Sequence, residues 1–387
     1  MNPFKSKFLL DPSIVFLNHG SFGATPIPVF ETYQNWQKQL ESQPVLFLGR
    51  KYHDLLLQAR QVLSRYIGLQ TDNVVFVPNA TYAVNLVARS LHLNPGDEVL
   101  TSDHEYGACD TVWEFYCKKQ GAVYRHQSIP FPAATSEEMA EQFWSGVNKN
   151  TKIIFISHIS SPTALRLPVE FICERARQNG ILTMIDGAHA PGQISLDLKR
   201  LHADFYTGNC HKWMLSPKGA GFLYAHPDVQ QLLDPLVLSW GSRTNPEFSS
   251  GSQFVDMLTW TGTHDPAAYL SVPSAIEFMQ FNDWPVVVKD CHQQLLSYLP
   301  KFTELTGKNI LYPLENQFIQ MAAIELPIIS DLGQFKTALY DNFQIEIPPI
   351  EWNNRHFLRI SYQVYNDPQD LDRLYDALSI LIPKFKK

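Results

Sequence analysis

The middle of the chain alternates short apolar runs with longer amphipathic segments, and this alternation constrains the fold more than any other feature. Apolar runs that predict buried strands lie at 73–77, 98–101, 152–156, 181–185, 203–207 and 221–225. Segments with helical spacing of apolar residues lie between them, at 81–91, 110–120 and 169–179. Apolar strands separated by helices are typical of a mostly parallel sheet that helices cover on both faces. The sequence therefore predicts an α/β fold.

The pattern changes after Pro266, where helices and shorter alternating strands follow one another. The expected helices lie at 267–281, 284–299 and 368–381, and the expected strands at 318–326, 345–348 and 357–361. A chain of 387 residues is long enough for two domains. We expect an N-terminal arm over 1–22, a large domain over 23–266 and a smaller α+β domain over 267–387.

Composition narrows the class of protein. The formal net charge of −7 gives no electrostatic footprint for nucleic acid, and no apolar run reaches the length of a membrane span. The first eleven residues carry two lysines but no long apolar segment of a secretion signal, so we expect a cytoplasmic protein without membrane partners. The five cysteines are scattered and include no C-x-x-C pair, which favours neither disulfides nor a zinc site.

Polar clusters follow five consecutive predicted strands. They lie at 78–81, 103–106, 157–161, 186–189 and 209–212. Because the carboxyl ends of parallel strands meet at one edge of a sheet, where such folds bind ligands, we expect these clusters to line a single cleft.

Two of these clusters supply the residues that pyridoxal phosphate (PLP) chemistry needs. Lys212 can form a Schiff base, and Asp186, 26 residues upstream, can hold the pyridinium nitrogen of the cofactor. A carboxylate beside that nitrogen favours its protonated form, which withdraws electrons from the substrate. Lys212 must be unprotonated to attack an aldehyde, and burial favours the neutral amine. A surface lysine and an aspartate in a turn are the ordinary alternatives.

The phosphate and the carboxylate of a substrate also have candidate partners. Asn79, Ala80 and Thr81 lie where a strand passes into a helix, so they suit a phosphate, although Asn79 or Thr81 could simply cap the helix. Asn209 and His211 could reach the phosphate or stabilise a turn. Arg359, in a predicted strand, could clamp a carboxylate through two hydrogen bonds or form a surface ion pair.

Three aromatic side chains are candidates for contacts with the cofactor ring. Tyr106 or His104 could place a ring over the cofactor, and Tyr106 is favoured because small residues follow it. His189 could donate to the phenolic oxygen of the cofactor, or it could be a structural histidine. A zinc hydrolase would need His158, His189 and His211 to converge, but their spacing matches no short zinc motif.

With these residues assembled, the chain resembles the class V aminotransferase superfamily of fold-type I PLP enzymes, within it the isopenicillin N epimerase-like group. The resemblance covers almost the whole chain and rests on the order and spacing of eight short runs. They are 17–23 (LNHGSFG), 79–81 (NAT), 103–106 (DHEY), 157–163 (SHISSPT), 185–193 (IDGAHAPGQ), 208–213 (GNCHKW), 260–265 (WTGTHD) and 358–362 (LRISY).

The resemblance implies a role for each matching residue. Lys212 would carry PLP as a Schiff base, Asp186 would pair with the pyridine nitrogen, His189 would lie near the phenolic oxygen and Tyr106 would stack on the ring. The phosphate would be held by Ala80, Thr81, Asn209 and His211. Thr263 would reach the phosphate of a neighbouring subunit, which implies a homodimer with shared sites. Arg359 would bind the substrate carboxylate, with Asn18, His19 and Gly20 on the substrate side.

The expected reaction is epimerisation or racemisation at the α-carbon of an amino acid or a peptide-like substrate. Elimination from a cysteine derivative by a C–S lyase is the first alternative, amino transfer the second, and a PLP-binding protein without catalysis the last. Epimerisation needs a second acid besides Lys212, for which Tyr106, His19 and water are candidates. Cysteine desulfurases of this superfamily use a cysteine of the C-terminal region, but Cys291 is the last cysteine here and lies in a predicted helix. Substrate preference would depend on segments such as 43–52 and 240–254.

Overall fold

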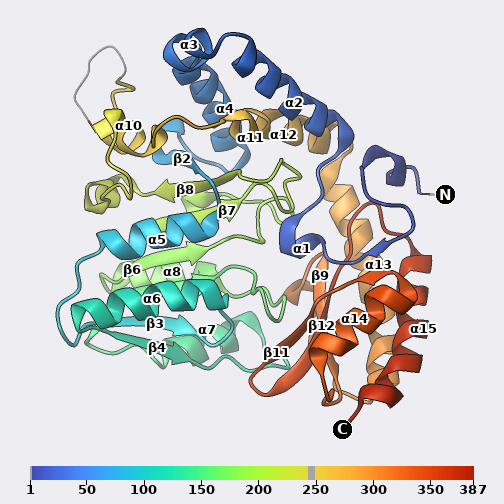
Figure 1. The fold of residues 1–387 in the computed structure, drawn as a ribbon. Coiled ribbons are helices and arrows are strands. Elements are labelled where there is room, and N and C mark those ends of the chain that lie inside the picture. Colours follow the sequence, from blue (N-terminus) through green and yellow to red (C-terminus); the bar gives the residue numbers. More distant parts are fainter. Residues whose placement is uncertain (1, 243–248) are drawn as a thin grey trace.

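The computed structural model describes residues 2–242 and 249–387, and its largest element is a seven-stranded sheet covered by helices (Figure 1). The strands run in the order β2-β8-β7-β6-β5-β3-β4. Their bounds are β2 Val74–Val77, β3 Glu98–Ser102, β4 Val123–Gln127, β5 Thr151–Ser157, β6 Leu182–Asp186, β7 Phe205–Asn209 and β8 Gly221–Ala225. Strand β8 is antiparallel to both of its neighbours, β2 and β7, whereas the pairs among β7, β6, β5, β3 and β4 are parallel. The prediction of a mostly parallel α/β sheet is confirmed.

Alternate residues of the strands face two separate helical layers, as the two-residue period of a strand requires. Val75, Val99 and Phe155 belong to one buried cluster with α5 (Ala80–Ser90) and α6 (Gly107–Gln120). Their neighbours along the strands belong to a second cluster with α7 (Ser136–Trp144) and α8 (Val169–Gln178). Both faces of the sheet are therefore covered, which explains why its central strands are apolar throughout.

Strand β4 was not predicted, and its position explains why. It lies at one edge of the sheet, pairs with β3 alone, and Val123 at its start is 48% exposed. An edge strand does not need a continuous apolar run, so its sequence VYRHQ carries little strand signal.

The N-terminal region forms helices that pack against the segment after Pro266. Its helices are α1 His19–Phe22, α2 Ile27–Ser42, α3 Pro44–Leu46 and α4 Tyr52–Tyr66. Figure 1 shows α2 and α4, in blue, beside α11 (Ala267–Leu270) and α12 (Val272–Phe281), in orange. The predicted helix over 267–281 is thus two helices that meet at Ser271.

The C-terminal part has a three-stranded antiparallel sheet in the order β11-β12-β9. Its strands are β9 Met321–Leu326, β11 Pro349–Trp352 and β12 Arg355–Ser361, and its helices are α13 Trp284–Thr306, α14 Leu332–Phe343 and α15 Pro368–Phe385. A separate parallel pair joins β1 (Val15–Phe16), near the N-terminus, to β10 (Ile345–Glu346). Two short helices, α9 (Leu198–Leu201) and α10 (Gln253–Thr259), complete the large part.

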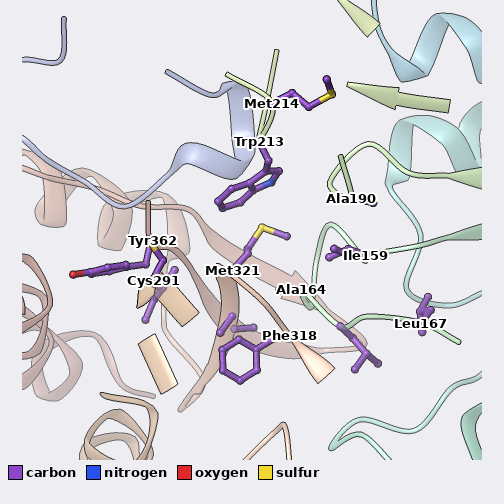
Figure 2. Packing of buried hydrophobic residues seen from close by; sticks show 14 of the residues in the cluster. Ile159, Ala164, Leu167, Ala190, Trp213, Met214, Cys291, Phe318, Met321 and Tyr362 are labelled. Atoms are coloured by element: carbon purple, nitrogen blue, oxygen red, sulfur yellow. The ribbon is translucent and has the colours of Figure 1, made fainter. Parts of the chain in front are cut away.

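One continuous apolar cluster joins the two parts of the chain. It includes Trp213 and Ala190 from loops of the large sheet, and Met321 and Tyr362 from the C-terminal part (Figure 2). The first turn of the N-terminal region also reaches this cluster, since an added Cβ at Gly20 would meet the Met321 sulfur at 2.7 Å. Trp213, which follows Lys212, therefore packs in a cluster to which both the C-terminal part and the N-terminal turn α1 contribute. No helix in the described ranges is long and apolar enough to cross a membrane.

Candidate active site

The carboxyl ends of the parallel strands meet around a cavity of about 290 Å³. Its lining includes residues that follow β2, β3, β5, β6 and β7, together with two residues of α1. The lining residues are Ser21, Phe22, Pro78, Asn79, Ala80, Thr81, Tyr106, Ser157, Ile159, Ser161, Asp186, Ala188, His189, Asn209, His211, Lys212 and Gly219. The expectation that the polar strand-end clusters share one cleft is confirmed.

Lys212 and His189 lie next to each other in the lining of this cavity. The amine nitrogen Nζ of Lys212 lies 3.2 Å from Nε2 of His189. The other ring nitrogen of His189, Nδ1, accepts a hydrogen bond from the indole N–H of Trp213 at 3.3 Å. Burial, followed by the charges of Lys212 and Arg359, holds the pKa of His189 well below its usual range, so the ring is neutral at ordinary pH.

The amine of Lys212 loses its proton more readily than an exposed lysine does. Burial and the nearby charge of Arg359 lower its pKa to about 8, although Asp186 and Cys109 act in the opposite direction. A substantial fraction of the amine is therefore neutral near pH 8, which is the form that attacks an aldehyde or accepts a proton.

Asp186 ends β6 and is buried, with 4% of its surface exposed. Its Oδ1 accepts from the backbone N–H of Ala188 at 2.8 Å, and the thiol of Cys109 lies 3.6 Å from Oδ2. Burial raises its pKa, whereas the Ala188 hydrogen bond and the charge of Lys212 lower it. A cationic ring nitrogen in the cavity would give this carboxylate the charged partner that it lacks among its hydrogen bonds.

The start of α5 is capped by two asparagines. Oδ1 of Asn79 accepts from the N–H of Tyr82 at 2.9 Å, and Oδ1 of Asn209 accepts from the N–H of Ala80 at 2.9 Å. The capping alternative thus holds for Asn79. The Thr81 amide, in the first turn of α5, has no partner within its own helix, and its residue lines the cavity beside the positive end of the helix dipole.

His211 also lines the cavity, and one of its ring nitrogens already has a hydrogen-bond partner. Its Nδ1–H donates to the carbonyl oxygen of Ala220 at 2.8 Å, and burial lowers its pKa to about 4. The remaining nitrogen, Nε2, carries a lone pair in the neutral ring. His211 can therefore donate to a phosphate only if the phosphate charge keeps the ring protonated.

The structure separates the two aromatic candidates for stacking. Tyr106 lines the cavity and is 47% exposed. His104 is fully buried outside it, where its two nitrogens hydrogen-bond with Thr163 Oγ1 at 2.8 Å and with the carbonyl oxygen of Ile129 at 2.9 Å. A stacking role can fall only on Tyr106 of these two.

Arg359 is not a surface residue; 5% of its area is exposed. Its Nη1 donates to the carbonyl oxygen of Ser161 at 2.6 Å and to the Ser161 hydroxyl at 3.0 Å, and Nη2 donates to Ser21 Oγ at 3.2 Å. Its buried Nε has no partner, and no carboxylate of the described ranges pairs with it. The ion-pair alternative is therefore wrong, and an uncompensated cation stands behind two residues that line the cavity, Ser21 and Ser161.

Asn18, His19 and Gly20 do not line the cavity, in contrast to the expectation from the sequence; Ser21 and Phe22 of the same turn do. Asn18 accepts from the Ser21 hydroxyl at 2.5 Å and donates to Glu346 at 2.8 Å. His19 is buried and bonded at both nitrogens, to Tyr365 Oη at 2.8 Å and to the Lys212 carbonyl oxygen at 3.1 Å. These residues contact the site from behind because α1 is a single turn whose first residues face the core.

Several lining residues carried no role in the sequence analysis. Ser157 and Ser161 lie in a strand-end cluster that was noted as a whole, and Ala188 lies between Asp186 and His189. Phe22 lies in the run 17–23 that supports the family resemblance, but it was given no role of its own. Thr263 is exposed and lies outside the cavity of its own chain.

Zinc ligation finds no support in the geometry of the three histidines. Within residues 2–242 and 249–387, no group of three His, Cys, Asp or Glu side chains is arranged to hold a metal ion. Nδ1 of His158 is bonded to Tyr206 Oη at 3.0 Å, and His211 is bonded to Ala220.

The cavity fits pyridoxal phosphate at each of its functional groups. The amine of Lys212 suits the aldehyde, the buried carboxylate of Asp186 suits the ring nitrogen, and the start of α5 suits the phosphate. The guanidinium of Arg359, which has no acidic partner among the described residues, suits the carboxylate of an amino acid.

Comparison with known proteins agrees with this reading of the site. Residues 19–313 match the model of the family described as aminotransferase class-V. The chain is 36% identical over 386 residues to isopenicillin N epimerase of Amycolatopsis lactamdurans, which covers 96% of each protein. It is 28% identical over 411 residues to the probable chloroplastic L-cysteine desulfhydrase of Arabidopsis thaliana, covering 96% of this chain and 84% of that protein.

The fold also matches solved structures. The cystine C–S lyase C-DES, solved in complex with its product cysteine persulfide, superposes with a TM-score of 0.83 at 18% sequence identity, over 97% of this chain and 99% of that one. This likeness establishes the fold-type I architecture.

Proposed function

The chain belongs to the class-V aminotransferase family, whose cofactor is pyridoxal 5′-phosphate, and we propose that it is an enzyme that epimerises the α-carbon of an amino acid or a peptide-like substrate. The observation that carries the proposal is the convergence of Lys212, His189 and Asp186 on one cavity backed by the uncompensated charge of Arg359.

In this proposal each functional group of the cofactor has its own partner residues in the cavity. Lys212 would hold it covalently, Asp186 would pair with its ring nitrogen and His189 would lie near its phenolic oxygen. Ala80, Thr81, Asn209 and His211 would hold the phosphate. When bound, the cofactor withdraws electrons from the α-carbon of the substrate and so makes the proton there acidic.

Lys212 would move that proton. Its pKa, lowered to about 8 by burial and by Arg359, allows the amine to accept a proton and to return it at moderate pH. Arg359 would orient the substrate by binding its carboxylate, because Ser161 and Ser21 fix the guanidinium at the cavity wall and leave its charge unpaired.

Epimerisation also needs a proton carrier on the opposite face of the α-carbon. His19 cannot serve, because it lies outside the cavity with both nitrogens bonded. Tyr106 lines the cavity with a half-exposed side chain, and we assign the second proton to its hydroxyl or to water next to it. The likeness to isopenicillin N epimerase supports this reaction.

Elimination by a C–S lyase is the second candidate, because the chain is also similar to an L-cysteine desulfhydrase. A desulfurase that forms a persulfide on its own cysteine is disfavoured. All five cysteines are free and buried, none lines the cavity, and burial raises the pKa of Cys291 in α13 to about 12. A buried thiol with a raised pKa is a poor nucleophile.

Incubation with isopenicillin N and with L-cysteine in deuterated water separates these reactions. We expect isopenicillin N to be inverted with deuterium at the α-carbon, and we expect Lys212→Ala to lose this exchange. Pyruvate and sulfide from L-cysteine without inversion of either substrate would establish a lyase. A keto acid with a pyridoxamine spectrum would establish an aminotransferase, and bound cofactor without any exchange would favour a binding role.

We also propose a cytoplasmic homodimer in which Thr263 of one subunit contacts the phosphate of the other. The exposed position of Thr263, outside the cavity of its own chain, supports this arrangement. The proposed division into 1–22, 23–266 and 267–387 would place the site between the two larger parts. Light scattering would test the dimer, and weaker cofactor retention in Thr263→Ala would test the shared site.

A further inference from the structure

The side chain that follows Lys212 points at the same histidine as the lysine does. Trp213 is fully buried, and its indole N–H donates to Nδ1 of His189 at 3.3 Å, while Lys212 Nζ lies 3.2 Å from Nε2 of the same ring. His189 is thus held between two consecutive residues of one loop. Each ring nitrogen has one partner.

These contacts determine which nitrogen of His189 carries the proton. The indole nitrogen of tryptophan can only donate, so Nδ1 must supply a lone pair. A neutral imidazole with a lone pair on Nδ1 carries its proton on Nε2. The ring is neutral because burial and the charges of Lys212 and Arg359 hold its pKa well below the usual range.

The surroundings of Trp213 keep its indole in this position. Its ring packs against that of His19, with 4.8 Å between centroids, and His19 in turn bonds to the Lys212 carbonyl oxygen. Gly192, with φ 91°, brings the loop that carries His189 against the Trp213 backbone, where an added Cβ would lie 2.2 Å from the Trp213 carbonyl oxygen. Figure 2 shows Trp213 in the cluster that contains Ala190 and Met321.

We propose that Trp213 is a positioning residue that fixes His189 with its proton on Nε2, so that His189 presents a permanent donor to Lys212 and to the phenolic oxygen of the bound cofactor. The part that concerns the cofactor rests on the proposed function. The tautomer itself does not.

The proposal has a consequence for the charge of Lys212. An ammonium group has three donors and no acceptor, so it cannot accept from the N–H on Nε2, whereas a neutral amine can. Trp213 therefore favours the neutral amine, in the same direction as burial and Arg359. Asp186 and Cys109 oppose this effect, and His19 faces His189 from the N-terminal turn. These are the charged and titratable groups around the pair.

Replacement of Trp213 by phenylalanine removes the N–H and keeps a ring in the cluster. Without the donor, the proton of His189 can move to Nδ1, and Nε2 then carries a lone pair. In the apoprotein this nitrogen can accept from a charged Lys212. In the holoenzyme it can no longer donate to the phenolic oxygen. In the holoenzyme, we expect the pH midpoint of the near-visible absorbance to rise by about one unit, the scale of one hydrogen bond to a charged group. Trp113→Phe is the matched control, because Trp113 is equally buried in α6 and its indole nitrogen has no partner.

Nitrogen NMR of histidine-labelled protein tests the tautomer directly, with the His189 signals assigned by their loss in His189→Gln. We expect a lone-pair shift for Nδ1 and a protonated shift for Nε2 in the wild type, and a mixture in Trp213→Phe. A protonated Nδ1 in the wild type, or an unchanged absorbance midpoint in a folded Trp213→Phe holoenzyme, would overturn the proposal. Wild-type protein that takes up no cofactor would contradict the proposed function instead, while the NMR result would still decide the tautomer.

Discussion

Arg359 donates to the carbonyl oxygen of Ser161 at 2.6 Å, and this contact joins β12 of the C-terminal sheet to the loop that follows β5 of the large sheet. It orients a buried cation that has no acidic partner among the described residues. A second set of contacts, from Arg359 through Ser21 and Asn18 to Glu346, connects the same guanidinium to the N-terminal turn and to β10. Three distant segments thus hold the Arg359 guanidinium in place.

Arg359→Gln should raise KM for a substrate with a carboxylate by roughly 100-fold, because truncation of a buried charged hydrogen-bond partner costs about 2–5 kcal/mol. Steady-state kinetics measures the effect. Arg355→Gln is the control. Arg355 lies on β12 like Arg359 but pairs with Glu325 of β9 at 2.5 Å, so its loss should affect Tm rather than KM. Equal KM values for both variants would show that Arg359 only supports the fold.

Lys212→Ala should abolish covalent attachment of the cofactor while the protein stays folded, because it removes the amine without disturbing the buried Trp213 next to it. Borohydride reduction followed by peptide mass spectrometry should place the label on Lys212 in the wild type. Lys218→Ala, in the exposed loop six residues later, should keep the label. A label that persists elsewhere in Lys212→Ala would mean that another lysine holds the cofactor.

Asp186→Asn should lower kcat by about 100-fold or more, the scale seen when one preorganised electrostatic contact is lost from an active site. The change keeps the shape of the side chain, so Tm should move little. Asp204→Asn should instead lower Tm and change kcat little. Asp204 accepts from the Thr183 N–H at 2.8 Å and holds β6 in place away from the cavity. A kcat that survives in Asp186→Asn would remove this residue from the chemistry.

Cofactor uptake by the apoprotein should speed up as the pH rises through about 8. The pKa of Lys212 is lowered to about 8 by burial and by Arg359, so the amine is protonated and inert below this value and neutral and reactive above it. Stopped-flow absorbance between pH 6 and 9.5 measures the rate. An uptake rate that does not change across this range would show that attack by Lys212 does not limit binding.

Much of the architecture could be predicted because it depends on local patterns. The apolar runs at 73–77 and 152–156 became β2 and β5 within one residue at each end, since buried parallel strands need apolar residues on both faces. The edge strand β4 and helix α14 escaped prediction, because partly exposed elements carry weaker periodicity. Lys212, Asp186 and His189 share a cavity because each lies at or just after the carboxyl end of a parallel strand, and that rule also needs only the sequence.

The sequence by itself determined the α/β class, the shared edge of the sheet and the resemblance to one enzyme family. Only the tertiary structure decided how each side chain is used. In the folded chain His104 is buried, whereas Tyr106 lines the cavity. Arg359 has serine partners in place of an acid, and the indole N–H of Trp213 donates to Nδ1 of His189. The reason is physical: the spacing of apolar residues is a local property, whereas the partner of a polar atom depends on segments that meet only when the chain folds.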